Sequence, residues 1–317
     1  MKDKYINING ICKSFGNTIA CDDISFSLKK GEIYAILGES GSGKSTLLKI
    51  LAGFENFDKG MFCIENNEIF SNKSFTKIEN RNIGLLFQDF SLLPNLSIKK
   101  NLEIIKRQLS NDDYSMINKE LSDFLDRFPH QISGGQQQRV ALIRTILMYP
   151  KLVLLDEPFS KLDESTKTQI RSDFRKILKQ KEISTILVTH DIGDAIEFAD
   201  KIIILKDGKI IENGTYKDII ENSSNKYVAS LLKHIVILNS NDFGLDEDKV
   251  FGVKPNDIIL FEGNYKGKIL NSIPFYNYFK IIFEYKDNIL FSFSENNIQV
   301  NTEVNFKINN DKLILLN

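Results

Sequence analysis

The sequence lacks the features that would bring the protein directly to a membrane or to nucleic acid. No apolar run approaches the roughly 18 residues that a membrane-spanning helix requires, and residues 1–5 do not begin an apolar stretch of the kind found in signal peptides. The formal net charge is −1, so no overall positive field attracts nucleic acid. We therefore expect a soluble cytoplasmic protein that reaches a membrane only through partners.

Cysteine and histidine are scarce. The three cysteines, Cys12, Cys21 and Cys63, lie far apart and none has C-x-x-C spacing, so packed thiols are favoured over a metal site or a disulfide. The chain also has only three histidines. It has 317 residues, of which 42% are hydrophobic and 26% charged, and this composition and length suit two globular domains.

The clearest motif is the stretch from Gly38 to Thr46, Gly-Glu-Ser-Gly-Ser-Gly-Lys-Ser-Thr, which fits the P-loop pattern G-x-x-x-x-G-K-[ST]. An apolar run at 33–37 predicts a buried strand before it, and residues 46–51 predict a helix after it. Glycines let backbone N–H groups turn inward around an anion, and the helix N-terminus adds its positive end. Lys44 would reach the β- and γ-phosphates of a nucleotide, and the Ser45 hydroxyl would bind Mg²⁺.

A second motif consists of the apolar run 152–155 followed by Asp156 and Glu157. A continuous apolar run of this length is typical of a strand buried on both faces of a parallel sheet. Asp156, at its carboxyl end, would bind Mg²⁺ together with Ser45 and phosphate oxygens. Glu157 suits a general base that orients or deprotonates the attacking water. A second metal ligand or a helix-capping acid is the alternative for Glu157.

The arrangement of predicted elements indicates two domains. Strands alternate with helices as far as about residue 236, which favours an α/β layered domain. Within it, residues 97–128 predict two helices separated by the polar stretch 110–113. From residue 237 onward the helical patterns disappear, and short alternating runs predict a small β-barrel or sandwich. We place the domain boundary between residues 236 and 237.

A third motif, Ile132-Ser133-Gly134-Gly135-Gln136, separates the possible P-loop families. With the two motifs above, it makes the chain resemble the ATP-binding subunits of ATP-binding-cassette (ABC) transporters, although Ile132 stands where leucine is usual. The resemblance implies an α/β P-loop NTPase fold with a helical subdomain at about 89–132, and ATP and Mg²⁺ as cofactors. It also implies that Ser133–Gln136 face the γ-phosphate held by a second subunit, in a head-to-tail homodimer.

Further positions match the same family. Phe15 resembles the aromatic residue that stacks on adenine, with a core phenylalanine as the alternative, and Gln88 resembles the Q-loop glutamine that contacts Mg²⁺ or water. Residues 160–163 resemble the D-loop, and His190 resembles the switch histidine that contacts the γ-phosphate. The resemblance thus implies three sets of site residues: catalytic Glu157, His190 and Gln88; metal-binding Ser45, Gln88 and Asp156; and nucleotide-binding Phe15, Gly38, Glu39, Ser40, Gly41, Ser42, Gly43, Lys44, Ser45, Thr46, Ser133, Gly134, Gly135, Gln136 and Asp163.

The C-terminal region, 237–317, is similar to the small oligonucleotide-binding-like (TOBE) domain of importer ATPases, chiefly at 253–257 and 304–316. Among the maltose, spermidine/putrescine, sulfate and ferric-iron importers, residues 127–139 and 157–160 resemble the ferric-iron type most. The resemblance implies an ATPase that energises ferric-iron import, with a polyamine, sulfate or a sugar as alternative cargo. The implied partners are membrane permease subunits and, indirectly, a solute-binding protein, at the cytoplasmic face of the membrane.

A soluble ABC ATPase that acts on DNA or ribosomes is the competing interpretation. DNA-repair types insert a long coiled coil between the P-loop and the signature motif, and the segment between Lys44 and Ser133 is too short to hold one. Translation-factor types carry two cassettes, and this chain has one. The C-terminal strands lack a basic and aromatic surface pattern, so we expect no nucleic-acid partner.

Overall fold

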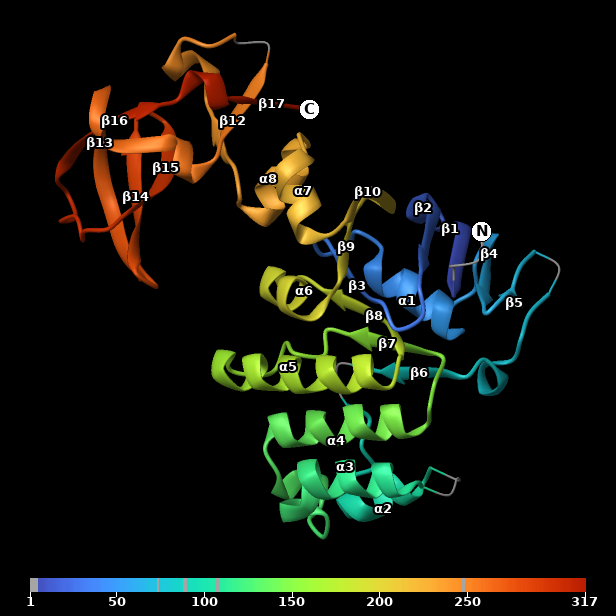
Figure 1. Cartoon of the computed structure of the whole chain (residues 1–317). Coiled ribbons are helices and arrows are strands. Elements are labelled where there is room, and N and C mark those ends of the chain that lie inside the picture. The colour runs from blue at the N-terminus through green and yellow to red at the C-terminus, as the bar shows by residue number, and fades with distance from the viewer. Residues whose placement is uncertain (1–4, 73, 88–89, 106–108, 247–248) are drawn as a thin grey trace. The chain divides into compact units, whose positions relative to one another are not determined.

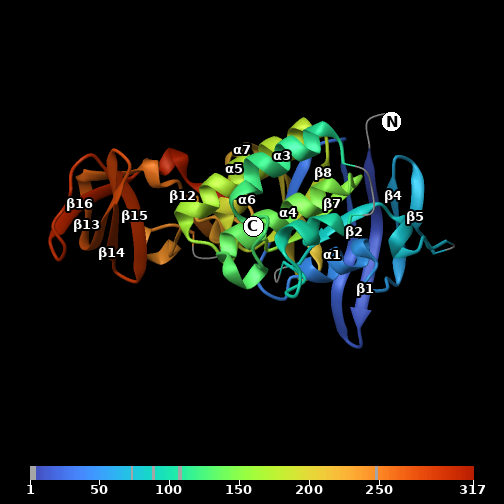
Figure 2. The ribbon, with the colours of Figure 1, turned by 90° about the horizontal axis from the view of Figure 1, so that it is seen from below.

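The computed structural model (Figures 1 and 2) describes residues 5–317 except 73, 88–89, 106–108 and 247–248. The chain forms two compact units, Met1–Tyr216 and Lys217–Asn317. The boundary proposed from the sequence, after residue 236, falls within the second unit. The reason is that α8 (Lys226–Leu232) is tied to the end of the chain: Lys226 N donates to Asn317 O at 3.0 Å, and Ala229 packs with Leu316.

The first unit contains two sheets of different kinds. The antiparallel sheet has the order β2-β1-β4-β5, with the strands β1 (Ile6–Phe15), β2 (Thr18–Leu28), β4 (Lys59–Ile64) and β5 (Asn67–Phe70). The second sheet has the order β10-β9-β3-β8-β7-β6, with the strands β3 (Ile33–Leu37), β6 (Ile83–Leu86), β7 (Leu152–Asp156), β8 (Ser184–Thr189), β9 (Lys201–Lys206) and β10 (Lys209–Gly214). From β9 to β6 all neighbours are parallel, and β10 is antiparallel to β9.

The helices cover the parallel sheet on both faces (Figures 1 and 2). Helix α1 (Lys44–Ala52) packs between the two sheets, where its apolar side chains join one core with residues of β1, β3 and β8. The other face is covered by α4 (Gly134–Leu147), α5 (Glu164–Gln180) and α6 (Ile192–Phe198). Every residue of β3 and β8 is buried, which agrees with the apolar sequence of β3 and the apolar run Ile186–Val188 in β8. The predicted α/β P-loop fold is confirmed.

The topology determines where polar side chains can gather. The carboxyl ends of parallel strands lie at one edge of a sheet, and β3, β8 and β7 are adjacent. The loop at 38–43 follows β3, Glu157 follows β7, and His190 follows β8. Three segments that are far apart in the sequence therefore meet at this edge.

The segment between β6 and β7 contains the predicted pair of helices. They are α2 (Ile98–Glu103) and α3 (Asn111–Leu121), accompanied by short 3₁₀ helices at Ser122–Phe124 and Pro129–Gln131. The polar stretch at 110–113 does not separate them as a loop. Instead it begins α3, because Ser110 Oγ accepts from Asp113 N at 3.2 Å and Asp113 Oδ2 accepts from Ser110 N at 2.9 Å.

The second unit is mostly β-structure, as the sequence predicts. After α7 (Tyr216–Asn222) and α8, it contains two sheets: β11-β12-β17, formed by Val236–Leu238, Val250–Val253 and Ile314–Leu316, and β15-β14-β13-β16, formed by Asn288–Ser294, Tyr278–Tyr285, Ile258–Phe275 and Glu303–Ile308. Both sheets contribute to one core that includes Val253, Phe283 and Phe306. These all-β sheets agree with the expected oligonucleotide-binding-like domain.

The strands of this unit are not all short, however. Strand β13 has 18 residues, because its first part pairs with β16 and its last part with β14. A bulge makes this possible: Leu260 and Tyr265 both pair with Phe306, and Gly263 between them has φ +90°. Such a bulge bends a strand and lets one chain segment serve two neighbours. Periodicity alone does not reveal it.

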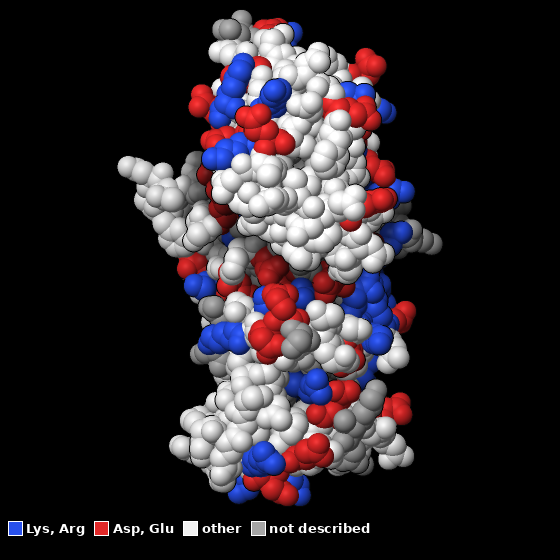
Figure 3. Space-filling model, turned by 90° about the vertical axis from the view of Figure 1, so that its left-hand side faces the viewer, with Lys and Arg blue, Asp and Glu red and all other residues white. Residues whose placement is uncertain are grey.

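Charges of both signs are interspersed on the face of each unit that Figure 3 shows, apart from a broad uncharged area on the C-terminal unit. Exposed apolar side chains of that unit include Phe261, Phe275, Tyr276 and Tyr278. Among the described residues, no helix is both long enough and apolar enough to cross a membrane.

A buried charge network holds the end of β8 against α5 and α6. Arg171 of α5 donates to Asp194 Oδ1 of α6 at 3.1 Å, and both side chains are 2% exposed. The Thr189 hydroxyl donates to Asp194 Oδ2 at 3.0 Å and accepts from Asp191 N at 3.0 Å. Lys167 of α5 lies 3.1 Å from Asp191 Oδ2. Thr189 and Asp191, at the end of β8, are therefore tied to α5 and α6.

Burial raises the pKa of Asp194 from 3.8 to about 6, and the nearby Asp191 carboxylate adds to this shift, while Thr189 and Arg171 oppose it. The folded state therefore holds this proton at pH values where the unfolded chain has lost it. The stabilisation from the proton is complete below pH 4 and is lost as the pH rises through about 6.

We predict that this group lowers the free energy of unfolding by about 3 kcal/mol between pH 4 and pH 7, since one pKa unit corresponds to about 1.4 kcal/mol. Urea titrations of the wild type and of Asp194→Asn at several pH values measure the effect. Asp194→Asn should lack this pH-dependent part of the free energy of unfolding. The amide can also change the free energy by an amount that is the same at every pH. Parallel pH profiles for the two proteins would contradict the prediction.

Candidate active site

The loop between β3 and α1 is shaped for an anion. Gly43 has φ +103°, and a Cβ atom there would lie 2.0 Å from the carbonyl oxygen of Ala20, so no other residue fits. Gly43 is the N-cap of α1 and provides no side-chain cap. The N–H groups of the first helical turn thus stay available to a phosphate at the positive end of the helix.

Lys44 is folded back onto its own loop. Its Nζ donates to Gly38 O at 2.8 Å, to Glu39 O at 2.7 Å and to Ser42 Oγ at 3.3 Å. Burial lowers its pKa, while the nearby carboxylates of Glu157 and Asp156 oppose this shift. The loop carbonyls therefore hold the ammonium within the loop that follows β3.

Ser45 and Asp156 form a small oxygen-rich site at the same edge. The Ser45 hydroxyl hydrogen-bonds to the Asp156 carboxylate, and burial together with the adjacent Glu157 raises the pKa of Asp156. Two adjacent carboxylates in a half-buried position favour a cation. Among the described residues, no group of three or more His, Cys, Asp or Glu side chains could hold a metal by itself. The donors present fit Mg²⁺, which takes few protein oxygens and completes its shell with phosphate and water.

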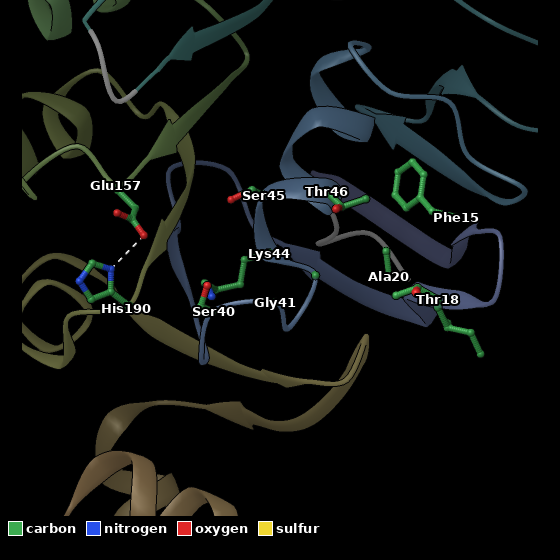
Figure 4. Close-up of a pocket in the computed structure, with 12 residues that line it drawn as sticks. Phe15, Thr18, Ala20, Ser40, Gly41, Lys44, Ser45, Thr46, Glu157 and His190 are labelled. Carbon is green, nitrogen blue, oxygen red and sulfur yellow. Dashed lines mark hydrogen bonds and ion pairs between the residues drawn. The ribbon is translucent and has the colours of Figure 1, made fainter.

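Glu157 and His190 face each other beside these groups. Glu157 Oε1 lies 2.9 Å from His190 Nδ1 (Figure 4). Glu157 has φ +46°, in the left-handed region that a glutamate rarely adopts. The bond from Glu157 N to Val188 O, 2.9 Å long, holds this conformation. Strained backbone of this kind concentrates at functional sites.

One cavity of about 670 Å³ connects these residues with Phe15. Figure 4 shows the loop and the start of α1 between Phe15 and Thr18 on one side and Glu157 and His190 on the other. Phe15 is 48% exposed, so it is not a core residue. The cavity is lined by Phe15, Thr18, Ile19, Ala20, Ser40, Gly41, Gly43, Lys44, Ser45, Thr46, Glu157 and His190.

Residues 18–20 also line the cavity, although no sequence motif predicts it. These residues begin β2, and the tight turn after Phe15 returns them to the cavity, with Phe15 paired to Thr18. The hairpin turn was the available signal. The lining of the cavity near Phe15 nevertheless depends on the register of β1 and β2, which the P-loop motif does not contain.

Several predicted site residues do not line this cavity. Gly38 and Ser42 are buried behind it, and the Glu39 carbonyl is bonded to Lys44. The segment Ser133–Gln136 begins α4, where Ser133 Oγ accepts from Gln136 N at 3.3 Å and Gln136 Oε1 accepts from Ser133 N at 2.9 Å. Asp163 caps α5 through Thr166 N at 3.0 Å. Gln88 lies outside the described residues.

The start of α4 is consequently a helix N-terminus whose first residues, Ser133 and Gly134, are exposed. A Cβ atom at Gly134 would have no neighbour within 4 Å. Within one chain, the start of α4 does not line the cavity around Lys44.

Comparison with known proteins places this site in a family. A family model described as "ABC transporter" matches residues 21–160. The probable sulfate/thiosulfate import ATP-binding protein CysA of Chlorella vulgaris is 37% identical over 237 residues, which are 72% of this chain and 98% of the relative. The Fe(3+) ions import ATP-binding protein FbpC of Fusobacterium nucleatum is 34% identical over 280 residues, 84% of this chain and 73% of the relative.

Solved structures agree with these relatives. An ATP-binding cassette solved as a dimer in a post-hydrolysis state, bound to ADP and Pi, is 31% identical with a TM-score of 0.56, covering 66% of this chain and 98% of the cassette. The cbiO1 protein of Clostridium perfringens, part of an ABC transporter complex, is 28% identical with a TM-score of 0.60, covering 69% and 94%. Taken with the geometry of its phosphate loop, Asp156 and Glu157, these likenesses show that the chain belongs to the ABC transporter family and is one of its ATP-binding subunits, an ATPase.

Proposed function

We propose that two copies of this chain bind two ATP molecules between them and that hydrolysis drives the import of a solute through membrane permease subunits. The observation that supports this most is the separation within one chain of the Lys44 loop from the exposed start of α4 at Ser133. Each is half of a phosphate site, and a head-to-tail pair would supply the missing half to each. The dimeric relative bound to ADP and Pi agrees with this arrangement.

In this proposal, residues at the edge of the sheet have separate tasks. Lys44 and the N–H groups of α1 bind the β- and γ-phosphates, and Phe15 stacks on adenine. Ser45, Asp156 and Gln88 hold Mg²⁺, which neutralises phosphate charge when bound. Glu157 accepts the proton of the attacking water, and His190, bonded to it at 2.9 Å, orients that carboxylate and contacts the γ-phosphate.

The cargo is proposed as an inorganic ion. The motifs at 127–139 and 157–160 favour ferric iron, whereas the relatives include proteins named for sulfate/thiosulfate import and one named for Fe(3+) import. The two ions are equally well supported. The import relatives also support a location on the cytoplasmic side of a membrane, bound to permease subunits.

The C-terminal β-unit is proposed as a TOBE regulatory domain. The all-β sheets formed by residues from 236 onward support this assignment. In this role the unit would extend the contact between two copies or respond to a ligand, and the ATPase domain would comprise residues 1–236.

We predict that Glu157→Gln keeps ATP binding but lowers ATP turnover by about 10²- to 10⁴-fold, because the amide cannot accept the water proton. Phosphate release measures turnover, and calorimetry measures binding. Glu221→Gln, which changes an exposed carboxylate of α7, serves as the matched control. Turnover near the wild-type rate in Glu157→Gln would exclude Glu157 as the base.

We also predict that Glu157→Gln forms an ATP-dependent dimer, since the bound nucleotide persists between the two copies. Sedimentation with and without ATP measures the mass. Adding Ser133→Arg should leave a monomer, because the large cation blocks the start of α4. Adding Ser122→Arg, another exposed serine of the helical region, should leave the dimer intact. If both double variants dimerise equally, the shared site is wrong.

Uptake by cells identifies the cargo. Cells that depend on this subunit should lose uptake of either labelled sulfate or labelled ferric iron when Glu157→Gln replaces the wild type, and uptake of the other ion should persist. Unchanged uptake of both ions would contradict the proposed inorganic cargo. The ATPase activity of the wild-type protein, measured in extracts of the cells used for uptake, shows whether unchanged uptake reflects another cargo or an inactive enzyme.

A further inference from the structure

A buried lysine lies against the Phe15 ring. Lys13 precedes Phe15 by two residues on β1, where the pairing with β2 is irregular. The Lys13 ammonium lies 4.7 Å from the centre of the Phe15 ring. Lys13 is only 9% exposed and does not line the cavity, whereas Phe15 does. The ammonium therefore covers part of the ring outside the cavity, in the arrangement of a cation–π contact.

Lys13 is held in turn by the segment that follows α1. Its Nζ forms an ion pair of 2.9 Å with Glu55 Oε1, and the side chains are 11% and 29% exposed. The hydrogen bond that Lys13 donates within this ion pair is the main cause of the lowered pKa of the Glu55 carboxyl. The pair is therefore partly shielded from water, Lys13 more than Glu55.

The backbone around this pair is also anchored. Asp58 Oδ2 accepts from Ser14 N at 2.7 Å, and Asp58 N donates to Cys12 O at 2.8 Å. The segment itself leaves α1 through Gly53, whose N–H bonds to Lys49 O at 2.9 Å, as does the N–H of Phe54. Residues 53–58 therefore connect the far end of the phosphate-binding helix to the strand that carries Phe15.

We propose that Lys13 and Glu55 are positioning residues for the nucleotide base. They hold the Phe15 ring so that one face meets the Lys13 ammonium and the rest stays open to the cavity. A half-exposed phenylalanine at a strand end would otherwise have to be ordered when the base arrives, and ordering a side chain weakens binding. This inference rests on the proposed stacking role of Phe15.

The proposal separates two parts of nucleotide affinity. In the proposed binding mode, the phosphates contact the loop and α1, whose residues line the cavity, and Lys13 does not line it. The base contacts the Phe15 ring, which Lys13 holds. Loss of the Lys13–Glu55 pair should therefore weaken ligands that carry a base and leave a base-free polyphosphate unaffected.

Calorimetry on the full chain with Mg²⁺-ATP and with Mg²⁺-tripolyphosphate tests this separation. We expect Lys13→Met, which keeps the length of the side chain but removes its charge, to weaken ATP about three- to tenfold and to leave tripolyphosphate affinity unchanged. Lys13→Arg should restore ATP affinity, because guanidinium keeps both the ring contact and the ion pair. Glu55→Gln should shift ATP affinity in the same direction as Lys13→Met but less.

Phe15→Ala is the reference variant. If Phe15→Ala weakens ATP and Lys13→Met does not, the positioning role is wrong although the stacking role stands. If Lys13→Met weakens tripolyphosphate as much as ATP, Lys13 acts on the whole site, and the proposal is overturned. If Phe15→Ala leaves ATP affinity unchanged, stacking and positioning both fail, while the hydrolytic role of Glu157, measured by turnover, is untouched. Should Lys13→Met not fold, Glu55→Gln decides alone, and wild-type ATP affinity in that variant overturns the proposal.

Discussion

The site depends on the parallel pairing of β3, β8 and β7. Each of these strands is buried almost completely, so their register cannot slip without exposing apolar side chains or burying polar ones. Because they run in one direction, the groups that follow them emerge at one edge. This pairing brings together Lys44, Glu157 and His190, which are far apart in the sequence.

The same constraint explains why the start of α4 does not line the cavity around Lys44. The strands bring the phosphate loop and the catalytic pair together, but the start of α4 follows a separate helical segment and caps itself through Ser133 and Gln136. The positive end of a helix favours an anion. In the proposed head-to-tail dimer, this helix end faces the nucleotide of the second copy.

Local motifs predicted the groups at the sheet edge well, since the P-loop and the strand that ends in Asp156 and Glu157 carry their chemistry within a few residues. They did not predict contacts that depend on pairing between distant segments. Thr18 lines the cavity because of hairpin register, Lys167 reaches Asp191 because α5 packs on α6, and β13 is long because a bulge at Gly263 lets it pair twice. In each case the determinant is tertiary packing, which overrides local pattern.

Helix α1 connects the phosphate loop with the ion pair beside Phe15. Its N-terminus supplies the uncapped N–H groups at Gly43, and the segment beyond its C-terminus supplies Glu55 to the ion pair behind Phe15. The phosphate side and the base side of the cavity are therefore attached to the two ends of one rigid element, itself packed between two sheets. In the proposed binding mode, a Phe15 ring that the Lys13–Glu55 pair already holds would need little rearrangement when the base of ATP arrives.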